Sequence, residues 1–179
     1  MIMGSIARRY ARALFSLAME KRSVEAWNLS LETLAAAVEA SPELKDVLQN
    51  PAYPREQRRA VVEKVAAAMQ LAQEPANLLF LLSDRNRLAA LAGVVAAFGE
   101  LADVELGRVR ARVTSAVPLD DASVAAIAEK LAASTQKKVL VERVVDPAIL
   151  GGVVAQVGSL VYDGSVRTQL EDLRKTLKQ

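Results

Sequence analysis

The spacing of apolar residues changes once along this chain, close to Gly107, and the change divides the sequence into two kinds of structure. Before Gly107 the apolar residues recur every three or four positions, which is the period of an amphipathic α-helix. From Arg108 onward valine and alanine alternate with arginine and threonine, which is the two-residue period of a half-buried strand. We therefore predict an α+β protein of two domains, residues 1–106 and 107–179.

The first domain is predicted to be a six-helix bundle with short connections. Ser41-Pro42 ends one helical pattern and opens the next, and Pro75 falls at another helix start. The six helical segments are expected at residues 5–18, 24–40, 42–48, 55–69, 75–82 and 88–106.

Two of these helices could form the walls of a groove. Residues 77–82 are apolar on nearly every side, so we expect this helix to be covered on all sides. The first helix carries the small residues Ala7, Ala11 and Ala18, which would let another helix approach its backbone closely. A groove between the two helices would suit an amphipathic helix of a partner, although the same faces also fit an ordinary bundle core.

The second domain is predicted to be a small α/β domain with a sheet of about three strands and two helices. The strands are expected at residues 109–117, 139–145 and 153–162, the third with Gly158 inside it. The helices are expected to begin after Asp120 or Asp121 and from Ser165. The pair Gly151-Gly152 is interpreted as a bend and not as a ligand loop, because glycine lacks the Cβ that restricts other residues.

The side chains of this sequence argue against catalysis. Cysteine and histidine are both absent, which removes the common nucleophile–base pairs and the usual zinc ligands. Asp120 and Asp121 fit helix capping, and the adjacent Glu142 and Arg143 would point to opposite faces of a strand. We expect no enzyme activity, no catalytic residue, no metal site and no cofactor.

Three arginines share one face of the first predicted strand: Arg108, Arg110 and Arg112. Such a row could follow a phosphate backbone, but a solvated sheet face explains it as well. The net charge is only +2, and aromatic residues for base stacking are scarce. We therefore expect no nucleic-acid partner and keep an RNA- or ribosome-associated adaptor as the alternative function.

The longest run without a charged residue, 147–162, is shorter than the roughly 20 apolar residues that span a bilayer. Glycines also interrupt this run. We therefore expect no membrane insertion, and the absence of a long heptad pattern predicts a monomer for the isolated chain.

Several separated motifs share one resemblance. Residues 6–15 read IARRYARALF, residues 146–152 read DPAILGG, and residues 163–167 read DGSVR. Together with Gly158 and the segment 77–91, they resemble the delta subunit of bacterial F-type ATP synthase, the counterpart of the mitochondrial oligomycin-sensitivity-conferring protein.

The resemblance implies a non-catalytic connector with a six-helix N-terminal domain and a smaller C-terminal α/β domain. The first domain would hold the N-terminal helix of an alpha subunit of the catalytic head. The second would bind the end of the b-subunit peripheral stalk, so that the link resists torque during proton-driven ATP synthesis. The protein would lie at the cytoplasmic face of the bacterial cell membrane, as a peripheral part of the complex.

Site residues follow from the resemblance combined with helix geometry. Two residues on each helix are our candidates for the walls of the alpha-subunit groove: Tyr10 and Ala13 on the first helix, Asn77 and Leu81 on the fifth. For the stalk interface we predict Leu170 and Leu173 on the last helix.

Overall fold

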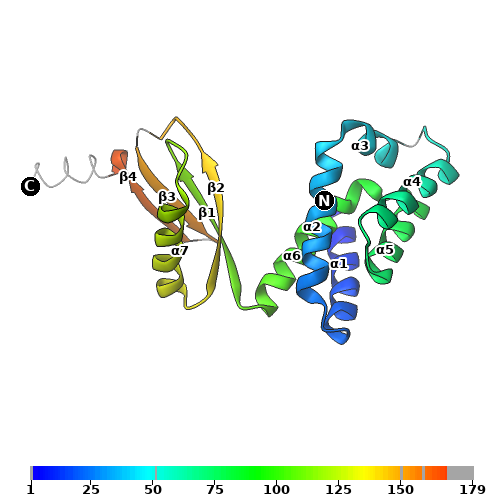
Figure 1. Ribbon diagram of the computed structural model, residues 1–179, viewed down its shortest axis with the longest axis horizontal. Helices are drawn as coiled ribbons and strands as arrows, with labels where there is room; N and C mark the ends of the chain where they lie inside the picture. Colours follow the sequence, from blue (N-terminus) through cyan, green and yellow to red (C-terminus); the bar gives the residue numbers. More distant parts are fainter. Residues whose placement is uncertain (1, 51, 150, 159, 169–179) are drawn as a thin grey trace, which may run out of the picture. The chain divides into compact units, whose positions relative to one another are not determined.

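The computed structural model describes residues 2–50, 52–149, 151–158 and 160–168, and their contacts divide the chain into two units, 1–102 and 103–179 (Figure 1). The division falls near the end of a helix, a few residues before the change in apolar period. The α+β prediction is confirmed, because helices fill the first part and a sheet fills most of the second.

The first unit is entirely helical over its described residues. Its elements are α1 (Ile2–Glu20), α2 (Val24–Ala40), α3 (Pro42–Gln49), α4 (Arg55–Ala68), α5 (Gln73–Asp84), a short 3-10 helix η1 (Leu88–Ala90) and most of α6 (Leu91–Glu105).

Local chemistry explains several of the helix ends. The Ser41 side chain accepts a hydrogen bond of 3.3 Å from the Leu44 amide, and Pro42 occupies the first helical position, so α3 begins there. Past the ends of α1, α4 and α5, the residues Arg22, Gln70 and Asn86 adopt positive φ, the left-handed conformation that stops a helix.

Helix α1 turns its small residues toward the core of its own unit. Ala7, Ala11 and Ala18 are buried there with Phe98 of α6. A Cβ added at Gly93 of α6 would lie 3.1 Å from the Ala7 Cβ, so α6 comes close to α1 at this point. The close approach to these alanines is thus made within the bundle, which agrees with the alternative of an ordinary bundle core and not with a partner helix at this face.

Helix α5 is not covered on all sides. Leu78, Leu79 and Leu82 are buried, but the Leu81 side chain is 42% exposed. The sequence expectation is wrong at this position, because no other helix of the described chain covers this face of α5 and Leu81 lines a groove at the surface.

The second unit holds a four-stranded mixed sheet. Its elements are β1 (Arg108–Ser115), α7 (Asp121–Thr135), β2 (Lys138–Val145), β3 (Gly152–Val157) and β4 (Leu160–Ser165). The strand order is β2-β1-β3-β4, with β1 parallel to β2 and antiparallel to β3. The β1–α7–β2 connection follows from this order, since parallel neighbours need a long crossover.

The predicted count of about three strands is wrong, because the third predicted strand folds back on itself. Val157 of β3 pairs with Leu160 of β4, and Gly158 between them has φ of 59°. The dipeptide Gly158-Ser159 is a two-residue hairpin signature, and positive φ at glycine carries no Cβ penalty.

Helix α7 packs on one face of the sheet, as Figure 1 shows. Ala111, Val113, Ala155 and Val157 point to that face and form a small core with Leu131 of α7. The predicted cap of the last helix is confirmed, since the Ser165 Oγ accepts a hydrogen bond of 3.3 Å from the Thr168 amide. The rest of the predicted helix, including Leu170 and Leu173, lies outside the described residues.

Candidate partner-binding groove

A surface groove runs between α1 and α5, and the structure brings all four predicted groove residues together in it. Its volume is about 200 Å³. The lining residues are Tyr10, Ala13, Leu14 and Leu17 on α1 and Glu74, Asn77, Leu78 and Leu81 on α5. The predicted grouping of these four side chains therefore agrees with the geometry.

The two helices run in opposite directions and are tied at both ends of the groove. At one end the Lys21 ammonium forms an ion pair with the Glu74 carboxylate. At the other end the Arg87 guanidinium donates a hydrogen bond of 3.1 Å to the Tyr10 hydroxyl. These ties link residues far apart in the sequence and connect the two walls of the groove.

The groove is apolar between its ends. Leu14 and Leu78 are buried at its base, whereas the Leu17 side chain is 41% exposed at its rim and resembles Leu81 in that respect. The hydrogen bond from Lys21 lowers the pKa of Glu74 below its usual value, so this carboxylate is ionised at neutral pH. The arrangement offers apolar contact along the groove and charge at its ends.

The sequence analysis missed four of the lining residues. Leu14 and Leu17 follow Tyr10 at steps of four and three residues, so the helical repeat itself could have indicated them. On α5, Leu78 directly follows Asn77, and Glu74 precedes Asn77 by three residues, about one helical turn. For Glu74 no apolar pattern gives a signal, because its place in the groove depends on the ion pair with Lys21.

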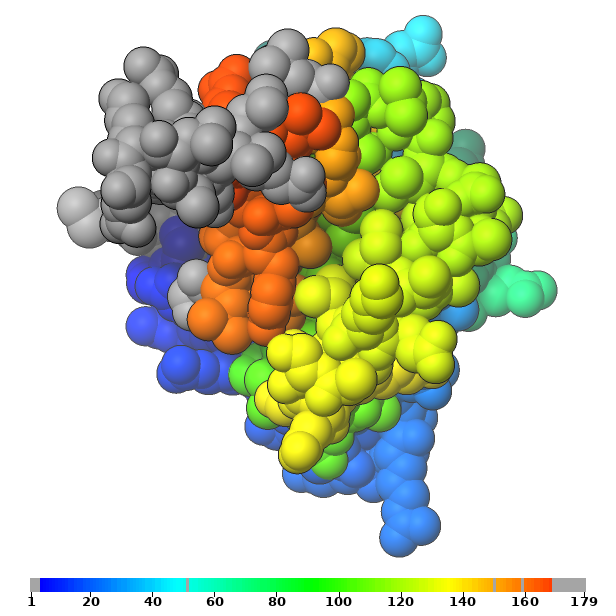
Figure 2. All heavy atoms as spheres, turned by 90° about the vertical axis from the view of Figure 1, so that its left-hand side faces the viewer, coloured from blue at the N-terminus to red at the C-terminus, as the bar shows by residue number. Residues whose placement is uncertain are grey.

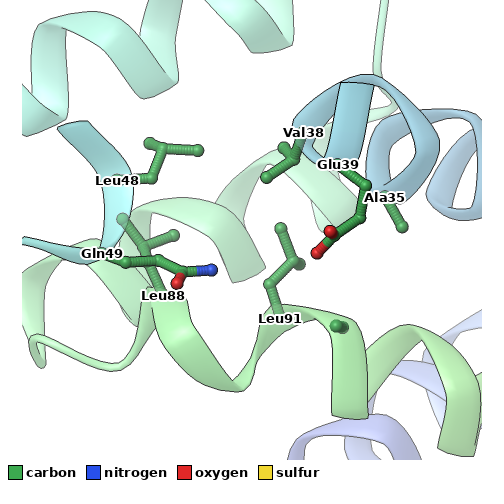
Figure 3. A pocket seen from close by; sticks show the side chains of 8 residues that line it. Ala35, Val38, Glu39, Leu48, Gln49, Leu88 and Leu91 are labelled. Carbon is green, nitrogen blue, oxygen red and sulfur yellow. The ribbon is translucent and has the colours of Figure 1, made fainter. Parts of the chain in front are cut away.

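A second cavity in the first unit is too small for a ligand. It lies between α2, α3 and the start of α6, where the side chains of Glu39 and Gln49 extend toward one another near Leu91 (Figure 3). Its volume is about 10 Å³, which is the space of a single water molecule. We therefore assign it no binding role.

The second unit has a wider trough between α7 and the β3–β4 hairpin. Its volume is about 570 Å³, and Ile127 and Leu131 of α7 face Val153 and Ala155 of β3 across it. The hydroxyl groups of Ser134 and Tyr162 share a hydrogen bond of 3.1 Å that joins its two walls.

Strand β4 lies at the edge of the sheet, and its atoms, in orange, reach the surface in Figure 2. Leu160 and Val161 of this strand are both more than half exposed. Together with the trough, this edge gives the second unit an apolar surface of its own.

The acidic residues considered for catalysis have structural roles. The Asp120 carboxylate caps α7 by accepting a hydrogen bond of 3.0 Å from the Ser123 amide, and its hydrogen bonding to Ser123 lowers its pKa. Asp121 pairs with Arg143 at 2.6 Å, and Glu142 pairs with Arg112 at 3.6 Å on the other face of the sheet. None of these three carboxylates lines the groove or the trough.

The arginines of β1 are engaged with carboxylates of the same unit. The Arg110 Nε lies 2.5 Å from an Asp103 carboxylate oxygen, and the Arg108 Nε lies 3.8 Å from the other one. Arg112 pairs with Glu142. These three arginines thus share two carboxylates of the same unit, so the row is largely neutralised within the protein and the feature that suggested RNA binding is weakened.

Within the described ranges, no three acidic side chains gather in a way that would hold a metal ion. In the same ranges, no helix combines the length and the apolar character that a membrane span requires.

Comparison with known proteins agrees with the resemblance seen in the sequence. The family model for the ATP synthase delta (OSCP) subunit matches residues 6–177. The ATP synthase subunit delta of Anaeromyxobacter dehalogenans is 70% identical over 179 residues, and that of Myxococcus xanthus is 51% identical over 181 residues. Both matches cover 100% of each chain, and neither supports the adaptor alternative.

A solved structure shares the fold. A chain of the Toxoplasma gondii mitochondrial ATP synthase hexamer superposes with a TM-score of 0.75 at 22% identity, covering 97% of each chain. The family match spans nearly the whole sequence and agrees with these relatives, so the chain belongs to the ATP synthase delta (OSCP) family, a non-catalytic stator component of F-type ATP synthase.

Proposed function

We propose that this subunit connects the catalytic head to the peripheral stalk by holding the N-terminal helix of an alpha subunit in the groove between α1 and α5. One observation carries the proposal: Leu17 and Leu81 are each about two fifths exposed, on facing walls of an apolar groove. An amphipathic helix seated there would remove both side chains from water, which is the usual energetic basis of helix-in-groove binding.

The ties at the ends of the groove support a mechanical role. A stator must transmit torque through protein interfaces, and a groove whose walls could separate would yield under load. The Lys21–Glu74 ion pair and the Arg87–Tyr10 hydrogen bond connect α1 to α5 at both ends, so they oppose separation of the walls.

For the second unit we propose binding to the end of the b-subunit stalk. Its trough and the exposed edge strand β4 supply apolar surface for such a contact. Leu170 and Leu173 stay predictions for this interface, since they lie outside the described residues.

The remaining parts of the proposal concern location and assembly. The subunit would lie at the cytoplasmic face of a bacterial membrane, peripheral to it, and would be a monomer when isolated. It would perform no bond chemistry, since a connector needs only binding surfaces. Light scattering of the purified chain tests the monomer directly, and a stable homodimer would contradict it.

The test of the groove is titration calorimetry of the full chain against a synthetic peptide of the alpha-subunit N-terminus from Anaeromyxobacter dehalogenans. Leu81→Asp and Tyr10→Asp place a charge in the groove and should weaken binding by about 2 kcal/mol or more, roughly 30-fold. Leu29→Asp is the matched control, because Leu29 is 66% exposed on α2 and does not line the groove.

If Leu81→Asp and Leu29→Asp weaken peptide binding equally, the groove assignment is contradicted. Absence of binding by the unmodified chain would contradict the proposed alpha-subunit contact as a whole. Circular dichroism of each variant verifies that it remains folded before the comparison is made.

A further inference from the structure

The two ends of the groove differ in charge. Glu74 lines the groove with a side chain that is 16% exposed, while its ion-pair partner Lys21 is 55% exposed and is not among the lining residues. At the opposite end Arg87 is exposed and contacts the lining residue Tyr10. A helix in the groove would thus meet a carboxylate that is ion-paired with Lys21 at one end and the Arg87 guanidinium at the other.

The ends are far enough apart to act separately. Tyr10 and Lys21 mark them on α1, and eleven residues at about 1.5 Å per residue give a separation of about 16 Å. That distance is roughly twice the screening length of about 8 Å at physiological ionic strength. The lining residues between the two ends carry no charge, so each end acts on the nearest part of a bound helix.

An α-helix carries partial positive charge at its amino end and partial negative charge at its carboxyl end. We propose that Glu74 and Arg87 set the direction of the bound helix, with its amino end at Glu74 and its carboxyl end at Arg87. This inference rests on the proposed function of the groove. The bound helix would run parallel to α5, and the reverse orientation would place its positive amino end against the Arg87 guanidinium.

Paramagnetic NMR of the full chain tests the direction. The alpha-subunit peptide from Anaeromyxobacter dehalogenans carries a nitroxide label either at its amino end or at its carboxyl end. We expect the amino-end label to broaden the signals of Leu17 and Asn77, which lie toward Glu74. We expect the carboxyl-end label to broaden the signals of Tyr10 and Leu81, which lie toward Arg87.

Charge variants test whether these two residues cause the preference. Glu74→Gln and Arg87→Gln should each weaken peptide binding about twofold to fivefold, the effect of one charge at a helix end. The controls Glu63→Gln and Arg12→Gln change exposed charges that do not line the groove, and binding should not change. The double variant Glu74→Lys, Arg87→Glu should reverse the broadening pattern, which a merely structural role of the two residues would not do.

The outcomes separate the two proposals. Tight binding with the opposite broadening pattern, or with both labels acting equally at both ends, would overturn the assigned direction and leave the groove standing. A double variant that binds in the original direction would overturn the role of Glu74 and Arg87. No binding of the unlabelled peptide would overturn the groove itself, and the direction with it.

Discussion

At the residue scale, the glycine that opens β3 and the glycine that follows it both have positive φ but different surroundings. Gly152 has φ of 82° and Gly158 has φ of 59°. A Cβ on Gly152 would lie 2.3 Å from the Gly164 carbonyl oxygen of β4, whereas a Cβ on Gly158 would meet no atom within 4 Å. Positive φ favours glycine at both positions. Only at Gly152 is there also no room for a Cβ beside the backbone of β4.

We predict that Gly152→Ala lowers the free energy of unfolding of the second unit by about 3 kcal/mol or more, because strained φ and backbone overlap add. Gly158→Ala should cost only about 1 kcal/mol, the strain alone. Urea titration followed by NMR of the β1 amides measures both. If both variants lose the same free energy of unfolding, the close approach of Gly152 to β4 does not add to the cost of the substitution.

Asp163 links pH to the stability of the second unit. Its carboxylate accepts hydrogen bonds of 2.9 Å from the Ser165 amide and 2.8 Å from the Thr168 hydroxyl, and the bonds to Ser165 above all lower its pKa from 3.8. A carboxylate with a lowered pKa stabilises the fold above the unfolded-state pKa and loses that effect as pH falls through the folded-state pKa.

We therefore expect the second unit to lose stability as the pH falls below about 5 and on through the folded-state pKa of Asp163, which lies below 3.8, and Asp163→Asn to reduce that dependence. Urea titrations at pH 7 and at acid pH give the comparison. Glu129→Gln changes an exposed carboxylate on α7 and serves as control. If both variants keep the full acid dependence, Asp163 is not its source.

At the element scale, α1 uses two faces for two purposes. One face packs Ala11 and Ala18 into the core, and a neighbouring face turns Tyr10, Ala13 and Leu17 toward the groove. The same substitution should therefore have different effects on the two faces.

Ala11→Leu should lower the free energy of unfolding of the first unit by about 2 kcal/mol, because Ala11 is fully buried and the core has no room for the larger side chain. Ala13→Leu should change that stability by less than about 0.5 kcal/mol, since Ala13 is exposed. It should instead fill part of the groove and weaken peptide binding. Fluorescence of Trp27, the only tryptophan, and calorimetry report the two effects. A stability loss equal for both variants would contradict this division of faces.

At the scale of the whole molecule, the two units have cores of very different size. Among the described residues, 20 buried side chains form the core of the first unit and five form that of the second. Buried apolar area is the main favourable term in folding, so the second unit is expected to unfold at lower urea concentration.

Leu31→Ala should destabilise the first unit by about 2 kcal/mol or more and lower the urea midpoint that Trp27 fluorescence reports. Val113→Ala should leave that midpoint in place and lower only the midpoint seen in the β1 amide signals. Coincident midpoints in all three proteins would mean that the units unfold as one.

The sequence by itself determined the fold class and the family. The change in apolar period at Gly107 follows from local backbone geometry, and the separated motifs, with Tyr10 and Asp163 among them, carry the family match. The grouping of Tyr10 with Asn77 was also predictable, although it came from the family resemblance and not from periodicity.

Only the tertiary structure decided which neighbour covers each apolar face. Periodicity shows that Ala11 and Leu81 are apolar, but not that Ala11 is buried in the core while Leu81 stays exposed. The pairing of Arg112 with Glu142 likewise depends on the parallel register of β1 and β2. Local patterns fix which side of an element avoids water, whereas contacts distant in the chain fix what meets that side, because they depend on the packing of all the elements together.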